Sequence, residues 1–346
     1  AAVAATAIGL LAKEQVASAP IAMLIYDSVF LYGSLLAAIR RRAAFYAGLA
    51  ATWSIFVALT SFGPRSATVG FGLGITPLDY LRTQAGVLVH YLRLAFWPHP
   101  LCISYSNWPI EHSWVQSAPE GVFILVLLAL TAWSLYRRWW PGFAGAWFFI
   151  ILAPSSSFVP IISEIAAERR MYLPLLSIVI VVVGFGAWMY KAIFRALPGS
   201  AAVLQIFYAL IAFILLGASA ATMYRNRQFQ TAEGILGATL QARPGDELAR
   251  GALMQEAAQN GNMDLAHSLF QGGLRLNPAS ESVYYNWGEC LAISGNVGAA
   301  IKEFEALLTI NPGNHRAQRR LGQLLLGQGR ASEAVDYLAA GLWHSP

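Results

Sequence analysis

Two adjacent arginines open one of the hydrophobic stretches of this chain and are the residues best suited to chemistry. They lie in the sequence Glu168-Arg169-Arg170-Met171-Tyr172. Paired guanidinium groups can grip a phosphate or diphosphate through bidentate hydrogen bonds, and Glu168 can fix the guanidinium geometry. The same pair also fits arginines that reach from a membrane interface toward lipid head groups. The sequence leaves both interpretations open.

Further polar residues interrupt apolar sequence elsewhere. Lys13-Glu14 breaks an apolar run, either as an interfacial ion pair or as a site where Lys13 meets a lipid phosphate and Glu14 orients a cation or accepts a hydrogen bond. His90 and Arg93 form a second cluster with the sequence SYS at 104–106. Glu164 adds a carboxylate that can support the arginines or act as a base.

The elements that must position these residues are hydrophobic helices. Of all residues 57% are hydrophobic and only 12% are charged, so a membrane bundle is expected. A helix that crosses about 30 Å of hydrocarbon needs roughly 20 residues. The candidate spans are 16–38, 43–61, 120–136, 142–160, 171–190 and 202–223, with 1–12 as a partial span. Residues 80–97 carry Arg82, His90 and Arg93, and an amphipathic helix lying in the interface fits them better than a crossing helix.

Cation positions support that choice. If 80–97 lies in the membrane plane, the clusters at 40–42, 137–138 and 191–195 all fall on one face, as the positive-inside rule prefers. This topology puts the polar residues named above and everything after residue 224 on the non-cytoplasmic side. A carboxylate at Asp27 lies near the middle of its span, where we expect a hydrogen-bonded partner such as Tyr26 or a serine.

Charge and cysteine usage exclude several classes of protein. Residues 1–224 hold 13 Lys and Arg against 7 Asp and Glu, and residues 225–346 hold 10 against 11. The basic part is therefore the hydrophobic part, which favours lipid phosphate over nucleic acid. Cys102 and Cys290 have no metal-binding or redox spacing, and we expect both to be structural. No motif of a soluble enzyme or of a cofactor site is present, and the need for a divalent metal stays open.

A 34-residue period organises the rest of the chain. Prolines recur at 244, 278, 312 and 346, and small and aromatic residues keep the same phase. The pattern is that of tetratricopeptide repeats, with a half repeat at 225–246 and units at 247–280, 281–314 and 315–346. The fold class is therefore all-α: a polytopic membrane bundle over 1–224 with six to seven spans, then a solenoid over 225–346. Such a solenoid typically docks a peptide or protein.

Four stretches, in this order, resemble the transmembrane and tetratricopeptide-repeat O-mannosyltransferase family and its bacterial relatives. They are LLAKEQVASAPIAMLIYD at 10–27, HYLRLAFWPHPLCISYS at 90–106, AAERRMYLP at 166–174 and YRNRQFQTAEGILGATLQARPGD at 224–246. The resemblance implies a glycosyltransferase with a polyprenyl-phosphate sugar donor and a protein hydroxyl as acceptor.

The resemblance also implies roles for single residues. Lys13, His90, Arg93, Arg169, Arg170 and Tyr172 are the expected donor-phosphate residues, and Glu14 and Glu168 are the expected catalytic carboxylates. In this family the acidic base lies in a first outer loop, which would precede Ala1. Because the sequence opens on AAVAATAIGLL, we expect residues upstream of it.

We therefore expect a glycosyltransferase-like protein of a bacterial inner membrane, whose periplasmic repeats recruit the acceptor. The alternative is a non-catalytic scaffold that docks a partner through its repeats. A flippase or transporter built on Asp27 is a third possibility, without an inverted repeat to support it.

Overall fold

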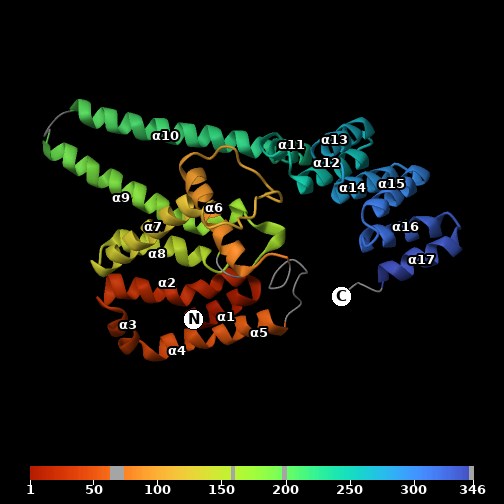
Figure 1. The fold of residues 1–346 in the computed structure, drawn as a ribbon. Helices are drawn as coiled ribbons and strands as arrows, with labels where there is room; N and C mark the ends of the chain where they lie inside the picture. The colour runs from red at the N-terminus through yellow and green to blue at the C-terminus, as the bar shows by residue number, and fades with distance from the viewer. Residues whose placement is uncertain (63–73, 157–159, 197–200, 343–346) are drawn as a thin grey trace. The chain divides into compact units, whose positions relative to one another are not determined.

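A computed structural model describes residues 1–62, 74–156, 160–196 and 201–342, which form helices joined by loops (Figure 1). It divides into two compact units. The first comprises residues 1–101 and 108–216, and the second comprises residues 102–107 and 217–346. The described part contains no β-strand. The expectation of an all-helical chain is confirmed.

The first unit contains nine helices of the described part besides the start of α10, and their lengths range from 7 to 25 residues. They are α1 (Ala2–Ala12), α2 (Ala19–Tyr26), α3 (Leu35–Arg41), α4 (Ala43–Ala51), α5 (Trp53–Phe62), α6 (Pro77–Phe96), α7 (Ala118–Tyr136), α8 (Trp140–Leu152) and α9 (Tyr172–Ala196). Single turns lie at η1 (Glu14–Ser18), η2 (Asp27–Leu31), η3 (Ile162–Glu164) and η4 (Glu168–Met171). Helix α8 packs against α2, α7 and α9, and α1 packs against α4 and α5 (Figure 1).

The candidate span 16–38 is bent and is not one continuous helix. Helix α2 passes into one π-helical turn, η2, and α3 then runs at 103° to the segment before it. The break lies at Gly33, whose φ of +74° is a conformation that glycine adopts without steric cost. Ser34 then caps α3, because its Oγ accepts from the N–H of Ala37 at 3.1 Å.

Two further expected spans are interrupted or shorter. The stretch 43–61 is divided at Thr52, whose hydroxyl bonds the carbonyl of Leu49 at 2.6 Å. The stretch 142–160 is helical only to Leu152, two residues before Pro154, which cannot continue a helix. Residues 157–159 of that stretch lie outside the described residues.

Three helices of the described part are long and apolar enough to cross a membrane: Ala118–Tyr136, Glu168–Arg195 and Leu204–Gln228. The bent pair Gln15–Leu31 and Leu35–Arg41 makes a fourth if it counts as one span. The six to seven spans expected from hydropathy stay a prediction. The region 80–97 forms α6, which is amphipathic: its buried residues recur every three to four positions from Tyr80 to Leu94.

The second unit continues from α10 (Ala201–Gln228), which begins in the first unit, into paired helices. They are α11 (Ala232–Ala242), α12 (Glu247–Gln259), α13 (Met263–Leu276), α14 (Glu281–Ile293), α15 (Val297–Ile310), α16 (His315–Gly327) and α17 (Ala331–Leu342). Each pair turns through a glycine with positive φ, at 261, 295 and 329. Fully buried alanines at 266, 300 and 334 let the two helices of a pair approach closely.

Gly142 lets the backbones of α7 and α8 approach closely in their hairpin. A Cβ at Gly142 would lie 2.5 Å from the backbone N of Leu135, so the two backbones can approach only without a side chain. We predict that Gly142→Ala destabilises the protein by about 1–3 kcal/mol. The control Gly186→Ala, where a Cβ meets nothing within 4 Å, should be neutral or stabilising by up to about 1 kcal/mol. Thermal unfolding in detergent compares them, and equal melting temperatures would contradict the argument.

Candidate functional site

Side chains of α6 hold the loop between α8 and α9. The hydroxyl of Tyr80 donates to the carbonyl of Ser155 at 3.0 Å, and the amide of Gln84 donates to the carbonyl of Ile165 at 3.0 Å. Both side chains are about 1% exposed. A buried backbone carbonyl needs a hydrogen-bond partner. These two bonds therefore allow Ser155 and Ile165 to be buried.

Tyr91 makes the third contact of this kind. Its hydroxyl donates to the carbonyl of Ala167 at 2.9 Å and accepts from the N–H of the same residue at 2.6 Å. Burial raises the pKa of Tyr91, so the hydroxyl keeps its proton and remains a donor. The contact fixes the backbone one residue before η4.

Arg170 is buried and directed inward. Its guanidinium donates to the carbonyls of Ser155 at 3.2 Å, Glu164 at 2.6 Å and Ile165 at 3.3 Å. These bonds tie both ends of the loop to one side chain. Arg170 therefore holds the loop, and its predicted contact with a phosphate stays a prediction.

Arg169 points the other way. Its side chain is 66% exposed and forms an ion pair with the carboxylate of Glu164. Glu164 is one of the two carboxylates that the sequence suggested for this guanidinium. The role of Glu168 stays a prediction. Neighbours in a tight turn face different directions, which explains why two adjacent arginines have different environments.

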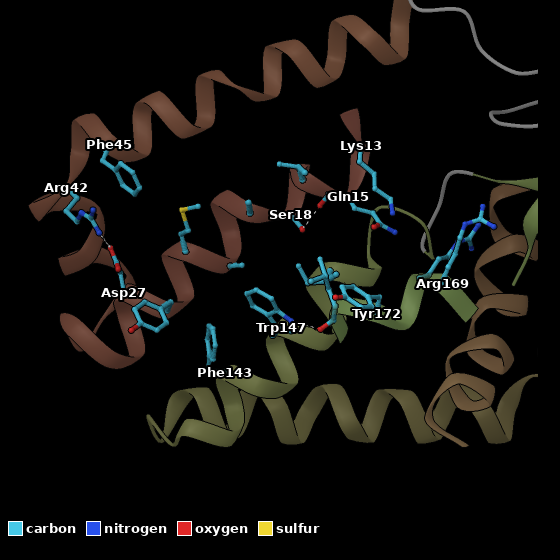
Figure 2. Close-up of a pocket in the computed structure, with 18 residues that line it drawn as sticks. Lys13, Gln15, Ser18, Asp27, Arg42, Phe45, Phe143, Trp147, Arg169 and Tyr172 are labelled. Atoms are coloured by element: carbon cyan, nitrogen blue, oxygen red, sulfur yellow. Dashed lines mark hydrogen bonds and ion pairs between the residues drawn. The ribbon is translucent and has the colours of Figure 1, made fainter. Parts of the chain in front are cut away.

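A cavity of about 550 Å³ lies beside Arg169 (Figure 2). Figure 2 shows Lys13, Gln15, Arg169 and Tyr172 at one end, with Trp147 farther along the cavity. The walls are mainly apolar: Val16, Ala19, Ala22, Met23, Phe143, Trp147, Ile151 and Leu173. The cavity therefore suits a molecule with an anionic end and an apolar body.

A buried carboxylate, Asp27, lines the opposite end of the cavity (Figure 2). Asp27 is 5% exposed at its side chain and accepts from Arg42 Nη1 at 2.8 Å and from the hydroxyl of Tyr46 at 2.6 Å. These partners differ from the expected Tyr26 or serine. These bonds join α4 to the π-helical turn. The charge of the Asp27 carboxylate at this end is balanced by Arg42, and its hydrogen bonds are made within the protein.

The structure brings together half of the predicted site. The cavity is lined by four of the predicted phosphate-binding residues, Lys13, Arg169, Arg170 and Tyr172. His90, Arg93 and Glu168 are not among its described lining residues. His90 instead lies edge-on to Trp108 at 5.1 Å, and Arg93 is exposed on α6. The side chain of Glu14 lies outside the described residues.

Sequence reasoning missed the supporting residues Tyr80, Gln84 and Tyr91. Their spacing along one face of α6 was a usable signal, since it places polar groups on the buried side of an amphipathic helix. Among the described residues, no group of three His, Cys, Asp or Glu side chains could hold a metal ion.

Residues Cys102–Asn107, the strap, belong to the second unit. The fully buried carboxylate of Asp246 accepts from Ser104 Oγ at 3.0 Å, Ser106 Oγ at 2.8 Å and the N–H of Ser106 at 3.0 Å. It also caps α12 by accepting from the N–H of Ala249 at 2.9 Å. One carboxylate thus joins the strap to the first full repeat.

Other contacts extend this attachment. The N–H of Ile103 donates to Thr239 Oγ1 at 3.2 Å, and Arg243 Nε donates to the side chain of Asn107 at 2.9 Å. The Arg243 guanidinium lies 5.0 Å from the ring of Tyr105, which is 3% exposed. The sequence SYS at 104–106 therefore serves the repeat unit in this structure.

Comparison with known proteins identifies the class of the C-terminal region. Two family models described as tetratricopeptide repeat match residues 252–315 and 291–342. Two crystal structures of MamA are similar at 24% identity. The match to the first has a TM-score of 0.28 and covers 44% of this chain and 82% of the MamA chain. The match to the second has a TM-score of 0.27 and covers 44% of this chain and 77% of the MamA chain. No curated protein matches the chain.

The chain thus contains tetratricopeptide repeats in its C-terminal region, which confirms that interpretation of the 34-residue period. Repeats of this kind support binding of a protein partner. The resemblance to the O-mannosyltransferases stays an expectation.

The two-way bond between Tyr91 and Ala167 allows a first test of the site. We predict that Tyr91→Phe destabilises the protein by about 1–3 kcal/mol, because it leaves the buried N–H of Ala167 without its hydroxyl partner and removes one of the two donors to the Ala167 carbonyl, which also accepts from the N–H of Arg170. The control is Tyr136→Phe, whose side chain is 85% exposed. Chemical unfolding measures both, and a Tyr91→Phe variant as stable as the control would show that the contact does not hold the loop.

The strap allows a second test. In Asp246→Asn one acceptor oxygen becomes an amide donor, while asparagine still caps a helix. We predict about tenfold faster maleimide labelling of Cys102, which is 3% exposed in the intact strap. Peptide mass spectrometry measures each cysteine separately. Burial raises the pKa of Cys290 to about 12, so its thiol should stay unreactive.

The control for this test is Asn296→Asp, the opposite exchange at the N-cap of α15, where the side chain accepts from Ala299 N–H at 3.2 Å. It should leave the labelling of Cys102 unchanged. Equal labelling rates in Asp246→Asn and the unmodified protein would mean that the strap does not depend on the carboxylate.

Proposed function

We propose that this chain is an inner-membrane protein that binds a polyprenyl-phosphate-linked sugar in the cavity beside Arg169 and transfers the sugar to a protein hydroxyl. The repeats recruit the protein acceptor on the same, periplasmic side. The observation that carries the proposal is the cavity itself, with exposed cationic side chains at one end and apolar walls along its length.

The exposed surfaces of the long helices support a membrane location. Large apolar side chains such as Val183 on α9 and Leu216 on α10 are 64% and 71% exposed. In the most apolar part of the helix Leu204–Gln228, no residue is buried inside the protein. Apolar surface of this extent is costly in water, and contact with lipid removes the cost.

The two ends of the donor would meet different surroundings. Lys13 and Arg169 would bind the phosphate through charge-assisted hydrogen bonds, with Glu164 holding the Arg169 guanidinium. The prenyl chain would lie against the apolar walls formed by residues such as Met23 and Trp147.

In the proposed reaction an acceptor hydroxyl oxygen bonds to the anomeric carbon of the sugar while the bond from that carbon to the phosphate oxygen breaks. The electron pair of the broken bond leaves with the phosphate, and the cations lower the barrier by stabilising this charge. The hydroxyl proton passes to a carboxylate, for which Glu168 and Glu14 are the proposed candidates. His90 and Arg93 remain proposed phosphate ligands from α6.

Arg169→Ala tests the proposal directly. We predict that it lowers transfer from polyprenyl-phosphate mannose to an acceptor protein by about 10²–10³-fold, because the leaving phosphate loses its cation. Among the residues that the structure describes, the exposed guanidinium of Arg169 is bonded to Glu164 alone, so folding should survive. The matched control is Arg137→Ala, which removes an exposed arginine outside the cavity. Transfer unaffected by Arg169→Ala in active protein would refute the role.

A scaffold that docks a partner through its repeats is the second candidate, favoured by the tetratricopeptide-repeat matches. It predicts a stable stoichiometric complex with a partner and no transfer from any lipid-linked sugar. Transfer by the purified protein would exclude it.

A further inference from the structure

Helix α16 carries a positive charge that the neighbouring repeat helices do not share. It contains Arg316, Arg319 and Arg320, and neither Asp nor Glu occurs between His315 and Gly327. In each of the other helices from α12 to α17, acidic residues equal or outnumber basic ones. The positive charge of the repeats is therefore concentrated on the first helix of the last pair.

Pairs at equivalent repeat positions show which of these arginines is neutralised. Gln255 on α12 donates to Asn286 on α14 at 2.9 Å. The same two positions one repeat later hold Glu289 and Arg320, which form a bidentate ion pair at 2.8 and 3.0 Å. Arg320 thus takes part in the packing of α16 on α14, and its charge is balanced.

Arg316 and Arg319 are not balanced in this way. Both side chains are exposed, and neither has an ion pair with a described residue. Arg316 lies over the ring of Tyr285 at 4.3 Å, and burial of Tyr285 raises its pKa, so the ring beneath the guanidinium stays neutral. Residues three apart are neighbours on a helix surface, so the two arginines occupy adjacent positions of α16. Arg316 lies on the side of α14, and Arg319 lies on the side of α17, where a Cβ at Gly341 would be 3.3 Å from Arg319 Cβ.

We propose that Tyr285, Arg316 and Arg319 form a docking surface for a short acidic segment of a partner protein. Guanidinium groups bind carboxylates in bidentate geometry, and Tyr285 adds an apolar surface beside them. The identity of the ligand class follows from charge complementarity. The proposal deepens the proposed role of the repeats in recruiting a protein and does not depend on the cavity of the first unit.

The surrounding charge favours a short peptide over an extended polyanion. Acidic residues lie on the helices in contact with α16: Glu281 and Glu289 on α14, Glu303 and Glu305 on α15, and Glu333 and Asp336 on α17. Glu289 and Glu333 are paired with arginines, while Glu281 bonds the side chains of Asn311 and Asn314. A nucleic acid or a charged membrane would meet these carboxylates, whereas a few acidic side chains can lie on the arginines alone.

The experiment measures fluorescence anisotropy of labelled peptides with the full chain purified in an uncharged detergent. A short peptide of Glu and Ser should bind more tightly than a Lys and Ser peptide of equal length, and added salt should weaken the binding. Arg316→Ala combined with Arg319→Ala should weaken binding of the acidic peptide about tenfold. The matched control combines Arg275→Ala with Lys302→Ala, exposed cations on the second helices α13 and α15.

Equal weakening in both double variants, or equal binding of the two peptides, would overturn the proposal. A circular dichroism melt shows that each variant is folded. Arg169→Ala should bind the acidic peptide normally even if it abolishes transfer, and loss of peptide binding in that variant would count against a separate surface. Absence of transfer by the unmodified protein would refute the proposed enzyme and would leave α16-dependent peptide binding intact.

Discussion

A loop that enters a protein core must find partners for its own backbone polar groups, and this requirement shapes the first unit. The loop before α9 is buried at Ile165, Ala166 and Ala167, where water cannot satisfy the N–H and carbonyl groups. Side chains supply the missing bonds, from Tyr80, Gln84 and Tyr91 on one side and from Arg170 on the other. The position of Arg169 at the cavity is a consequence of this arrangement.

Charged side chains lie at both ends of the cavity, but only those at one end have hydrogen-bonding capacity left for a ligand. At one end the Asp27 carboxylate is already satisfied by Arg42 and Tyr46. At the other end the Lys13 side chain is exposed, and Arg169 keeps donors available beyond its bond to Glu164. An anionic ligand therefore gains interaction energy at one end only, and the apolar walls determine which way its body lies. The direction of binding follows from this difference.

Periodic features of the chain were predictable, and local breaks and distant contacts were not. Four prolines spaced by 34 residues predict the repeats because each unit repeats the same packing. Hydropathy averages over about 20 residues, so it cannot detect that Gly33 alone bends the segment 16–38. The polar character of Arg169 and Arg170 was evident, but their sequence does not indicate which faces the cavity. The partners of Tyr80, Gln84 and Tyr91 are backbone atoms 75 or more residues away, and residue type carries no signal for such pairs.

The strap makes the repeat unit discontinuous along the chain, and this has a consequence for biosynthesis. Ser104 and Ser106 are made well before Asp246, which lies 140 residues or more further along. During synthesis the two serines have no carboxylate partner until the first repeat has been translated. Bringing residues so far apart in the sequence together costs chain entropy, and contacts of this kind slow folding. A repeat fragment starting at α10 would therefore expose a carboxylate that the intact protein keeps buried, and would differ from it at its first helix pair.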